Sequence, residues 1–524
     1  MCNTISQPCS KIAERDDEIT HLADENARLR HRIALLEKAL FGPHSERLIG
    51  PGGEHPGQQV FEELLKELEG LNAELAEQEE PEPPKQAVKA KSRKRPPRNI
   101  EELVAGADLP KETVEVEPPA AQRVDPQTGA PLKRIEGHRT VRLAHRPGSY
   151  YLLEYHYPKY VNPSRPRAGV VQAPARNAAV LGGSYDESFM AKVVYDKCAK
   201  HLPLYRQAEE LRSLKLDISR QTLSRLYMHA ARTLAPVWLL MKSRIIDSGV
   251  IFTDDTPVNM LYKGRRKTVT GRMWVYIGGG KSPPYRVFEF TIDRSQKRPQ
   301  EFLKDFRGYI HADAYQGYDK LFLKDGVQEC GCWMHVRRKY VDAADAPPEL
   351  REEVLRAIRK LYIYERFIWR SNPDGMSGTE RDKLALWIRQ EKIAPLIDRL
   401  FKRTGKAILN GEVLPDSAFA KAIGYMHNLG EALKTFIQNP CLKPDNGQSE
   451  RAIRPLAIGR KNWLFAGCKE GGDATGILLS LVQTCRAMGV QPLGYLQDVL
   501  SRISDHPASK LHELLPDQWT PIRQ

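Results

Sequence analysis

The apolar residues near the start of the chain repeat every seven positions. Heptad position a holds mainly isoleucine, position d holds mainly leucine, and one a position holds an asparagine. This pattern favours a parallel two-stranded coiled coil, in which one buried asparagine fixes the register. Residues 12–48 therefore predict a leucine-zipper-like coiled coil that joins two copies of the chain; the alternative is a helix packed against its own chain. The predicted contact residues are Ile19, Leu22, Asn26, Leu29, Ile33 and Leu36.

Three segments with different patterns follow. Residues 49–99 contain one amphipathic helix and a basic, proline-rich stretch, 81–98, which predicts a disordered linker because it has almost nothing to bury. Residues 100–180 alternate apolar and polar positions, which is typical of a small β-rich module. Residues 186–245 have a helical period, with Ser219 as the predicted cap of a second helix after a short turn. This pair resembles a helix-turn-helix, although ordinary helix packing gives the same pattern.

From residue 249 to 472 the pattern predicts an α/β core. Three strand candidates follow one another, and further strands end near residues 313 and 333, with helices between them. A meander followed by such alternation predicts a mixed sheet flanked by helices. Residues 347–438 contain long helical patterns and are interpreted as an insertion into this core, and residues 474–515 predict a C-terminal helical segment.

Composition narrows the class of partner. The chain has 80 Lys+Arg against 66 Asp+Glu, a net charge of +14, which favours a polyanion, nucleic acid before membrane. No run of about 18 apolar residues is present that could span a bilayer. Eight scattered cysteines are typical of a reducing compartment rather than of a disulfide framework. We therefore expect a cytoplasmic protein that, in a bacterium, meets the DNA of the nucleoid.

Three carboxylates stand out by their context. Asp254 interrupts an apolar strand pattern, and Asp313 ends another. A carboxylate in such a place is costly unless it is paired or binds a metal. Glu450 follows a turn and helix-start signal and belongs to a short helix that we expect to end near Pro455. Each residue alone could equally be a helix cap or half of an ion pair.

Together, these three carboxylates suit catalysis by metal ions. Mg²⁺ (or Mn²⁺) prefers oxygen ligands, and two such ions can activate a water or a 3′-hydroxyl for in-line displacement at phosphorus. Phosphate contact is the role expected for nearby basic residues, with a solvated basic face as the alternative. These basic residues are Arg337, Arg338, Arg451, Arg454, Arg460 and Lys461. Cys330, Cys332 and His335 offer only three ligands, so a buried free cysteine pair is preferred to a metal site there.

Four long stretches carry a resemblance to a known family. FTDDTPVNML, GYIHADAYQGYD, GCWMHVRRKY and KPDNGQSERAIRPLAIGRKNWLFAG occur in that order. They resemble signature stretches of the DDE transposases of the insertion-sequence sixty-six family, over nearly the whole chain. The resemblance implies an RNase H-like (retroviral integrase-like) core with Asp254, Asp313 and Glu450 as its acidic triad. It also implies hydrolysis that exposes a 3′-hydroxyl at each element end, followed by strand transfer into target DNA, and companion proteins from the same element.

Several positions differ from the family or support its triad. Asp255 stands where the family commonly has Glu. We expect Asp255 and Asn446 to contact the triad residues and hold them in position. Family members usually carry paired cysteines in a small zinc module, whereas the corresponding stretches here, 123–129 and 159–164, contain none. Without thiolates we predict no zinc, and a module held by packing alone. Two other functions stay open: a nuclease on the same fold, and a non-catalytic DNA-binding or assembly protein of a mobile element.

Overall fold

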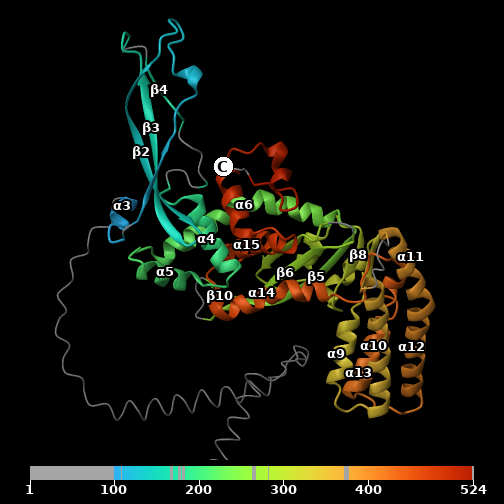
Figure 1. Cartoon of the computed structure of the whole chain (residues 1–524). Coiled ribbons are helices and arrows are strands. Elements are labelled where there is room, and N and C mark those ends of the chain that lie inside the picture. The colour runs from blue at the N-terminus through green and yellow to red at the C-terminus, as the bar shows by residue number, and fades with distance from the viewer. Residues whose placement is uncertain are drawn as a thin grey trace, which may run out of the picture. The chain divides into compact units, whose positions relative to one another are not determined.

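The computed structural model describes most of the chain after residue 98 (Figure 1). The described residues are 99–107, 109–165, 169–174, 179, 183–262, 267–280, 283–370 and 377–521. They belong to one structural unit, Pro96–Gln524. The predicted coiled coil (12–48) and basic linker (81–98) lie outside the described residues, so both stay predictions.

A mixed sheet forms the centre of this unit, with six strands among the described residues. Its main strands lie in the order β7-β6-β5-β8-β9, which confirms the predicted mixed sheet. The sequence pattern missed a short strand, β10, which pairs with the end of β5. The antiparallel strands are β5 (Val250–Met260), β6 (Val269–Gly278) and β7 (Arg286–Thr291), and the strands parallel to β5 are β8 (Gly308–His311), β9 (Val327–Cys330) and β10 (Phe465–Ala466).

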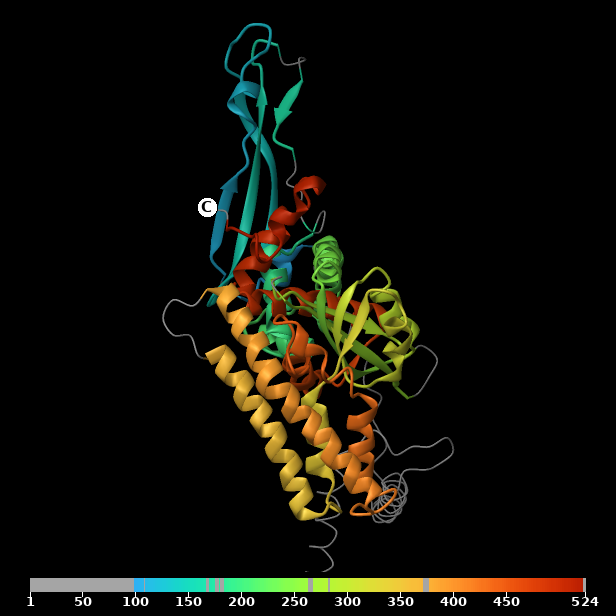
Figure 2. The ribbon, with the colours of Figure 1, turned by 90° about the vertical axis from the view of Figure 1, so that its right-hand side faces the viewer.

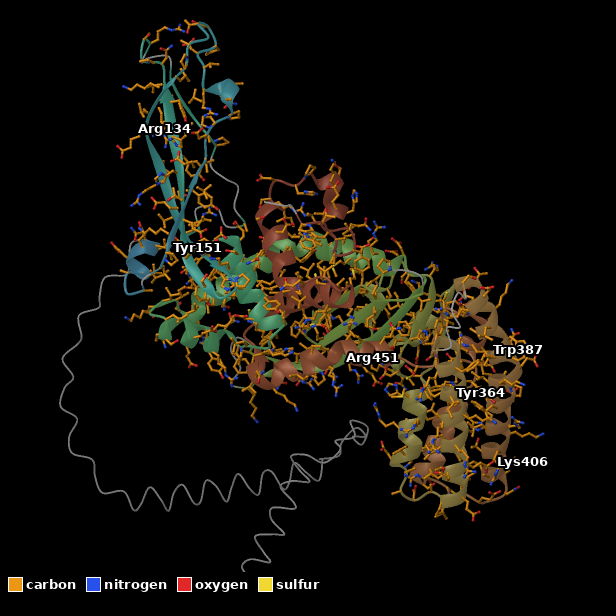
Figure 3. All side chains as sticks on the ribbon, viewed as in Figure 1. Arg134, Tyr151, Tyr364, Trp387, Lys406 and Arg451 are labelled. Carbon is orange, nitrogen blue, oxygen red and sulfur yellow. The ribbon has the colours of Figure 1, made fainter. Side chains whose placement is uncertain are left out.

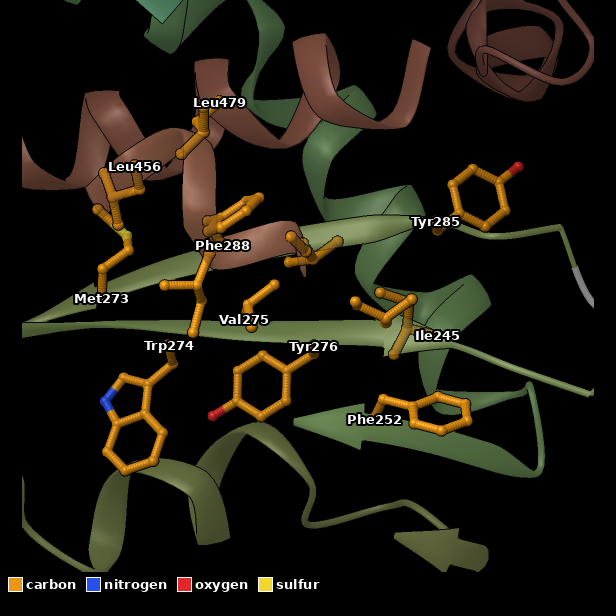
Figure 4. Packing of buried hydrophobic residues seen from close by; sticks show 14 of the residues in the cluster. Ile245, Phe252, Met273, Trp274, Val275, Tyr276, Tyr285, Phe288, Leu456 and Leu479 are labelled. Atoms are coloured by element: carbon orange, nitrogen blue, oxygen red, sulfur yellow. The ribbon is translucent and has the colours of Figure 1, made fainter. Parts of the chain in front are cut away.

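Helices cover both faces of this sheet. Successive side chains of a strand point to opposite faces, and β6 follows this rule with apolar residues on both. Figure 4 shows Met273 and Val275 on the side of Leu479, while Trp274 and Tyr276 point the other way. All four of these β6 side chains are fully buried. The helices involved are α6 (Arg220–Ile246), α7 (Lys297–Phe302), α14 (Gly447–Trp463) and α15 (Lys469–Ala487).

The segment between β9 and α14 is a helical insertion, which Figure 2 shows as a bundle coloured yellow to orange. Arg389 anchors it. Its fully buried guanidinium donates hydrogen bonds to both carboxylate oxygens of Glu365 and to the backbone oxygens of Phe436, Asn439 and Leu442. Because its donors find partners, the buried charge is tolerated. The helices are α9 (Trp333–Asp342), α10 (Pro348–Arg370), α11 (Gly378–Ile388), a π turn (Arg389–Ile393), α12 (Ala394–Leu409) and α13 (Ala418–Asn428).

The helix that carries Glu450 is longer than the sequence predicted. We expected it to end near Pro455, but α14 continues to Trp463. A proline inside a helix removes one backbone hydrogen bond. Here Ala452 and Leu456, on either side of Pro455, are buried, and this packing keeps the helix intact. Beyond α14 and α15, the C-terminal segment contains α16 (Pro492–Arg502).

A β-rich module and a group of helices precede the sheet. The strands are β1 (Lys111–Glu115), β2 (Lys133–Arg146), β3 (Ser149–Val161) and β4 (Val170–Gln172). β2 and β3 form a long hairpin whose turn contains Gly148 with φ 88°, a conformation that favours glycine. α3 (Ile100–Leu103) precedes the module, and α4 (Glu187–Cys198) and α5 (Leu204–Ser213) follow it. Ser219 caps α6 as predicted, but DNA contact by α5 and α6 stays a prediction.

The prediction that packing alone holds the β-rich module was wrong. Asp125 accepts hydrogen bonds from the backbone nitrogens of Gln127 (2.9 Å) and Thr128 (3.0 Å). It also accepts them from the side chains of Asn162 and Arg165. Asp125 and Asn162 come from the two cysteine-free stretches, so hydrogen bonds join these two turns. Within the described ranges, no helix is both long and apolar enough to cross a membrane.

Candidate active site

Asp254 and Asp313 lie on and just after two neighbouring strands of the sheet. β5 and β8 are parallel, and Phe252 of β5 is paired with His311, the last residue of β8. Asp254 continues β5, and Asp313 follows two residues after the end of β8. Extending the register past the strand end would place Asp313 opposite Asp254, one strand spacing of about 4.8 Å away.

Glu450 reaches the same region from α14. The first residues of this helix are fixed to β5, because Asn446 Nδ2 donates a 2.7 Å hydrogen bond to the backbone oxygen of Thr253. Thr253 directly precedes Asp254, and Asn446 is fully buried. One helical turn separates Asn446 from Glu450, so this bond places the glutamate near the two aspartates.

The acidic residues around Asp254 influence its protonation. Burial raises the pKa of Asp254 to about 8, and the negative charge of Asp313 is the second cause. Asp255 and Glu450 raise this pKa further. A group of mutually repelling carboxylates is stabilised by a bound cation. The site is therefore electrostatically suited to hold one.

Asp255 has a different environment from Asp254, although the two are adjacent on β5. Its carboxylate forms ion pairs with Arg272 of β6 (3.1 Å) and with Arg294 (2.9 Å). The guanidinium of Arg294 in turn lies over the ring of Tyr315, 4.2 Å from its centroid. Asp255 is thus neutralised by protein groups, and its role is to connect β5 to the segments on either side of the site.

The side chain of Glu450 contacts α9. Its Oε1 lies 3.7 Å from His335 Nε2, and its Oε2 lies 3.6 Å from Arg338 Nη2. His335 is not among the site residues that the sequence predicts. The only sequence signal for a role of His335 is its position two residues before Arg337, a predicted phosphate contact. The sequence does not predict that the helix carrying both residues approaches α14.

The oxygen atoms of the site are of the kind that magnesium prefers as ligands. The carboxylates do not, however, converge on one point. Among the described residues, no three or more His, Cys, Asp or Glu side chains form a group that could hold a metal as they lie. However, Glu450 Oε1 and Asn446 Oδ1 are buried without a hydrogen-bond partner in the described part of the chain. Buried oxygens of this kind, beside two aspartates, form the all-oxygen donor set that Mg²⁺ prefers.

The two cysteines near the site are packed, neutral thiols. Burial raises the pKa of Cys332 to about 12, and its Sγ accepts a hydrogen bond from the backbone nitrogen of Asn446 (3.2 Å). Cys330 and Cys332 are both buried free cysteines, as the sequence predicted, but they do not lie on the same element. Instead β9 ends at Cys330, and Cys332 caps the start of α9.

The predicted phosphate contacts surround the site on two helices. Arg337 and Arg338 are exposed on α9, and three further basic residues are exposed on α14. Figure 3 labels Arg451, at the end of α14 that faces the helical insertion. Arg460 differs, because its Nη1 donates to Thr256 Oγ1 and to the backbone oxygen of Pro257 and so holds α14 on β5. The exposed set on α14 is Arg451, Arg454 and Lys461.

A mixed sheet with helices on both faces and acidic residues on and just after its neighbouring strands β5 and β8 fits a class of phosphoryl-transfer core, and comparison with known proteins identifies one family. Residues 182–474 match the model of the Transposase IS66 family, and residues 480–516 match the IS66 C-terminal element. The chain belongs to this family of DDE transposases.

Similar proteins are found in Sinorhizobium fredii (strain NBRC 101917 / NGR234). Uncharacterized protein y4hP is 29% identical over 517 residues, which cover 94% of this chain and 88% of the relative. Uncharacterized protein y4qI is 30% identical over 510 residues, covering 94% and 89%. The similarity thus extends beyond the part of the chain that the family models match.

Proposed function

We propose that this chain is a transposase that cuts DNA at the ends of its element and joins the exposed 3′-hydroxyls to target DNA. Asp254, Asp313 and Glu450 are the proposed ligands of two Mg²⁺ (or Mn²⁺) ions. The observation that supports the proposal is the parallel pairing of β5, which carries Asp254, with β8, which leads to Asp313, together with the hydrogen bond from Asn446 that fixes the start of the Glu450 helix to β5. The strand order and the helical cover of the sheet support an RNase H-like core.

Each protein group has a defined task in this reaction. When bound, the two ions supply an activated water or 3′-hydroxyl and stabilise the leaving oxygen. The sheet fixes the backbone of Asp254, which lies within β5, and Asp313 follows two residues after the end of β8. The carboxylate of Glu450 lies 3.6 Å from the guanidinium of Arg338, which offsets its charge.

Basic residues around the triad hold the DNA in this proposal. Arg337, Arg338, Arg451, Arg454 and Lys461 contact phosphates, which orients the backbone but reads no sequence. Arg460 is given a structural role instead, because its Nη1 donates hydrogen bonds to Thr256 and Pro257 of β5. The N-terminal coiled coil would pair two chains, as two element ends require, and companion proteins of the same element stay an expectation from the family.

The central test uses labelled DNA carrying an element end, Mg²⁺ and Asp313→Asn. The amide cannot supply the anionic ligand, so we expect cleavage and joining to fall by about a thousandfold or more. Asp305→Asn, which changes an exposed side chain (74%) elsewhere on the core, serves as the matched control and should keep full activity. Cleavage without joining would indicate a nuclease, and binding alone would indicate an assembly protein. Wild-type rates for Asp313→Asn would refute the metal assignment.

A further inference from the structure

A groove runs along α10, first between α9 and α10 within the helical insertion and then between α10 and the start of the active-site helix α14. It consists of two cavities of about 270 and 380 Å³ that share Tyr362. The first is lined by Arg337 of α9 and Arg359 of α10, and the second by Trp369 of α10 and Arg451 of α14. We propose that this α10 groove binds a single DNA strand next to the active site. The inference rests on the proposed function and names the part of the DNA that the insertion contacts.

The charge of the α10 groove suits a phosphate backbone. Arg337, Arg359, Arg366 and Arg451 line it, and within the described ranges none of these four forms an ion pair. Lys443 adds a fifth positive charge. Unpaired arginines of this kind bind polyanions by releasing counterions from them.

The carboxylates that line the α10 groove are already engaged by the protein. Glu365 is bound by the Arg389 guanidinium and also accepts a 3.1 Å hydrogen bond from the Trp369 indole nitrogen. Asp445 accepts a 2.8 Å hydrogen bond from the backbone nitrogen of Gly447, at the start of α14. Arg389 neutralises Glu365, so among the described residues that line the groove Asp445 is the one carboxylate whose charge opposes the four arginines and Lys443, and the net charge of the groove lining is positive.

A tryptophan ring in the α10 groove is fixed in a position that suits stacking with a nucleobase. The Trp369 ring is fixed by two contacts: its indole nitrogen binds Glu365, and the Lys443 ammonium lies 3.3 Å from its ring centroid. The residue is nevertheless 37% exposed. Stacking of an unpaired base on an aromatic side chain contributes to single-strand binding whatever the base sequence.

The size and position of the α10 groove favour one strand rather than a duplex. Cavities of a few hundred cubic ångströms accept groups the size of a small molecule. A DNA duplex is too large for them, since its major groove alone is about 12 Å wide. Gln448 and Arg451 line the groove, and Glu450 lies between them on α14. A strand in the groove therefore continues directly towards the carboxylates, as the unpaired strand at a cut end would.

The test measures binding by the full chain without metal, so that it does not depend on catalysis. Fluorescence anisotropy in EDTA compares a blunt duplex with the same duplex carrying a short single-stranded extension. For Trp369→Ala we expect about tenfold weaker binding of the extended DNA, and less than a twofold change for the blunt duplex. Trp387→Ala, at an exposed tryptophan on α11, is the matched control and should leave both affinities unchanged.

Charge variants test the same groove without removing the tryptophan. Arg359→Gln with Arg366→Gln should lower the slope of log affinity against log salt for the extended DNA by about 1.4, because about 0.7 is lost for each phosphate contact to a single strand. Arg356→Gln, on the same helix but outside the groove, should not change this slope. Trp369→Phe keeps a ring and should restore part of the affinity if the chain is folded.

Two results would overturn the proposal of a single strand. In the first, both the Trp369→Ala and the double arginine variants bind the extended DNA with an affinity within twofold of that of the parent. The other is an equal loss for the blunt duplex, which would indicate a duplex contact. If Asp313→Asn cut and joined DNA normally, the proposed triad would fail, but these metal-free binding results would be unaffected. The two failures are therefore distinguishable.

Discussion

Two aspartates in different regions of the molecule have opposite electrostatic surroundings. Hydrogen bonds, above all the one from the backbone nitrogen of Gln127, hold the pKa of Asp125 in the β-rich module well below its usual range. In the core, burial and the neighbouring Asp313 raise the pKa of Asp254 to about 8. The protein's own donors stabilise the charged form of the first carboxylate, whereas the second stays protonated near neutral pH unless a cation offsets the charges around it. The first is thus suited to holding a fold together, and the second to binding metal.

The arginines that line the α10 groove also differ from those of the β-rich module. Those of the β-rich module form ion pairs with carboxylates, as Arg134 does with Glu115 and Arg146 with Glu112. Arg359 and Arg451, near the active site, form none within the part of the chain that is described. Exposed ion pairs stabilise a fold by only about 0–1 kcal/mol, yet they neutralise charge that DNA would otherwise meet. The contrast favours the helices near the site over the module as the DNA-binding surface.

Asp254→Asn should have the largest effect among the variants that test this contrast. The quantity compared is the pH dependence of the free energy of unfolding in EDTA. In the folded chain Asp254 stays protonated up to about pH 8, whereas in the unfolded chain it loses its proton near pH 4. The folded state therefore binds an extra proton between these values, and its stability falls as pH rises from about 4 to about 8. The amide does not titrate, so the variant should lack this loss, which amounts to as much as about 5 kcal/mol.

Urea unfolding of parent and variant at several pH values measures this difference. Mg²⁺ should stabilise the parent more than the variant at pH 8, because the cation relieves the repulsion that the amide has already removed. Identical pH slopes for the two proteins would show that Asp254 does not lie in a crowded acidic site.

Asn446→Ala tests the connection between α14 and the sheet. Truncation leaves the buried backbone oxygen of Thr253 without its 2.7 Å donor, which should cost about 1–3 kcal/mol of stability. If Asn446 positions Glu450, the variant should also need more Mg²⁺ for half-maximal cleavage at a temperature where it is fully folded. Asn410→Ala, at an exposed position after α12, provides the control. An unchanged Mg²⁺ requirement would reduce Asn446 to a purely structural residue.

The candidate site could be predicted from sequence because its signals are local. Asp254 and Asp313 each interrupt or end an apolar run, and a helix-start signal precedes Glu450. What the sequence could not predict depends on partners distant along the chain. Arg389 is satisfied by Glu365 and by three carbonyl groups about fifty residues away, and Asp125 by Arg165. Such contacts have no periodicity, so they become visible only when the fold brings the segments together.

Asp125→Ala completes the comparison, with the smallest expected effect. The variant loses the acceptor that joins two turns of the β-rich module, so we expect its melting temperature to fall by a few degrees. Because the pKa of Asp125 is depressed in the folded chain, its contribution is present above about pH 4 and is lost as pH falls through the folded value, the reverse of Asp254. The deficit of the variant relative to the parent should therefore shrink in acid. Thermal unfolding at pH 7 and pH 3 measures it, with the exposed Asp217→Ala on the turn before α6 as control. A deficit that grew in acid would contradict the reversed sign and with it the distinction between the two aspartates.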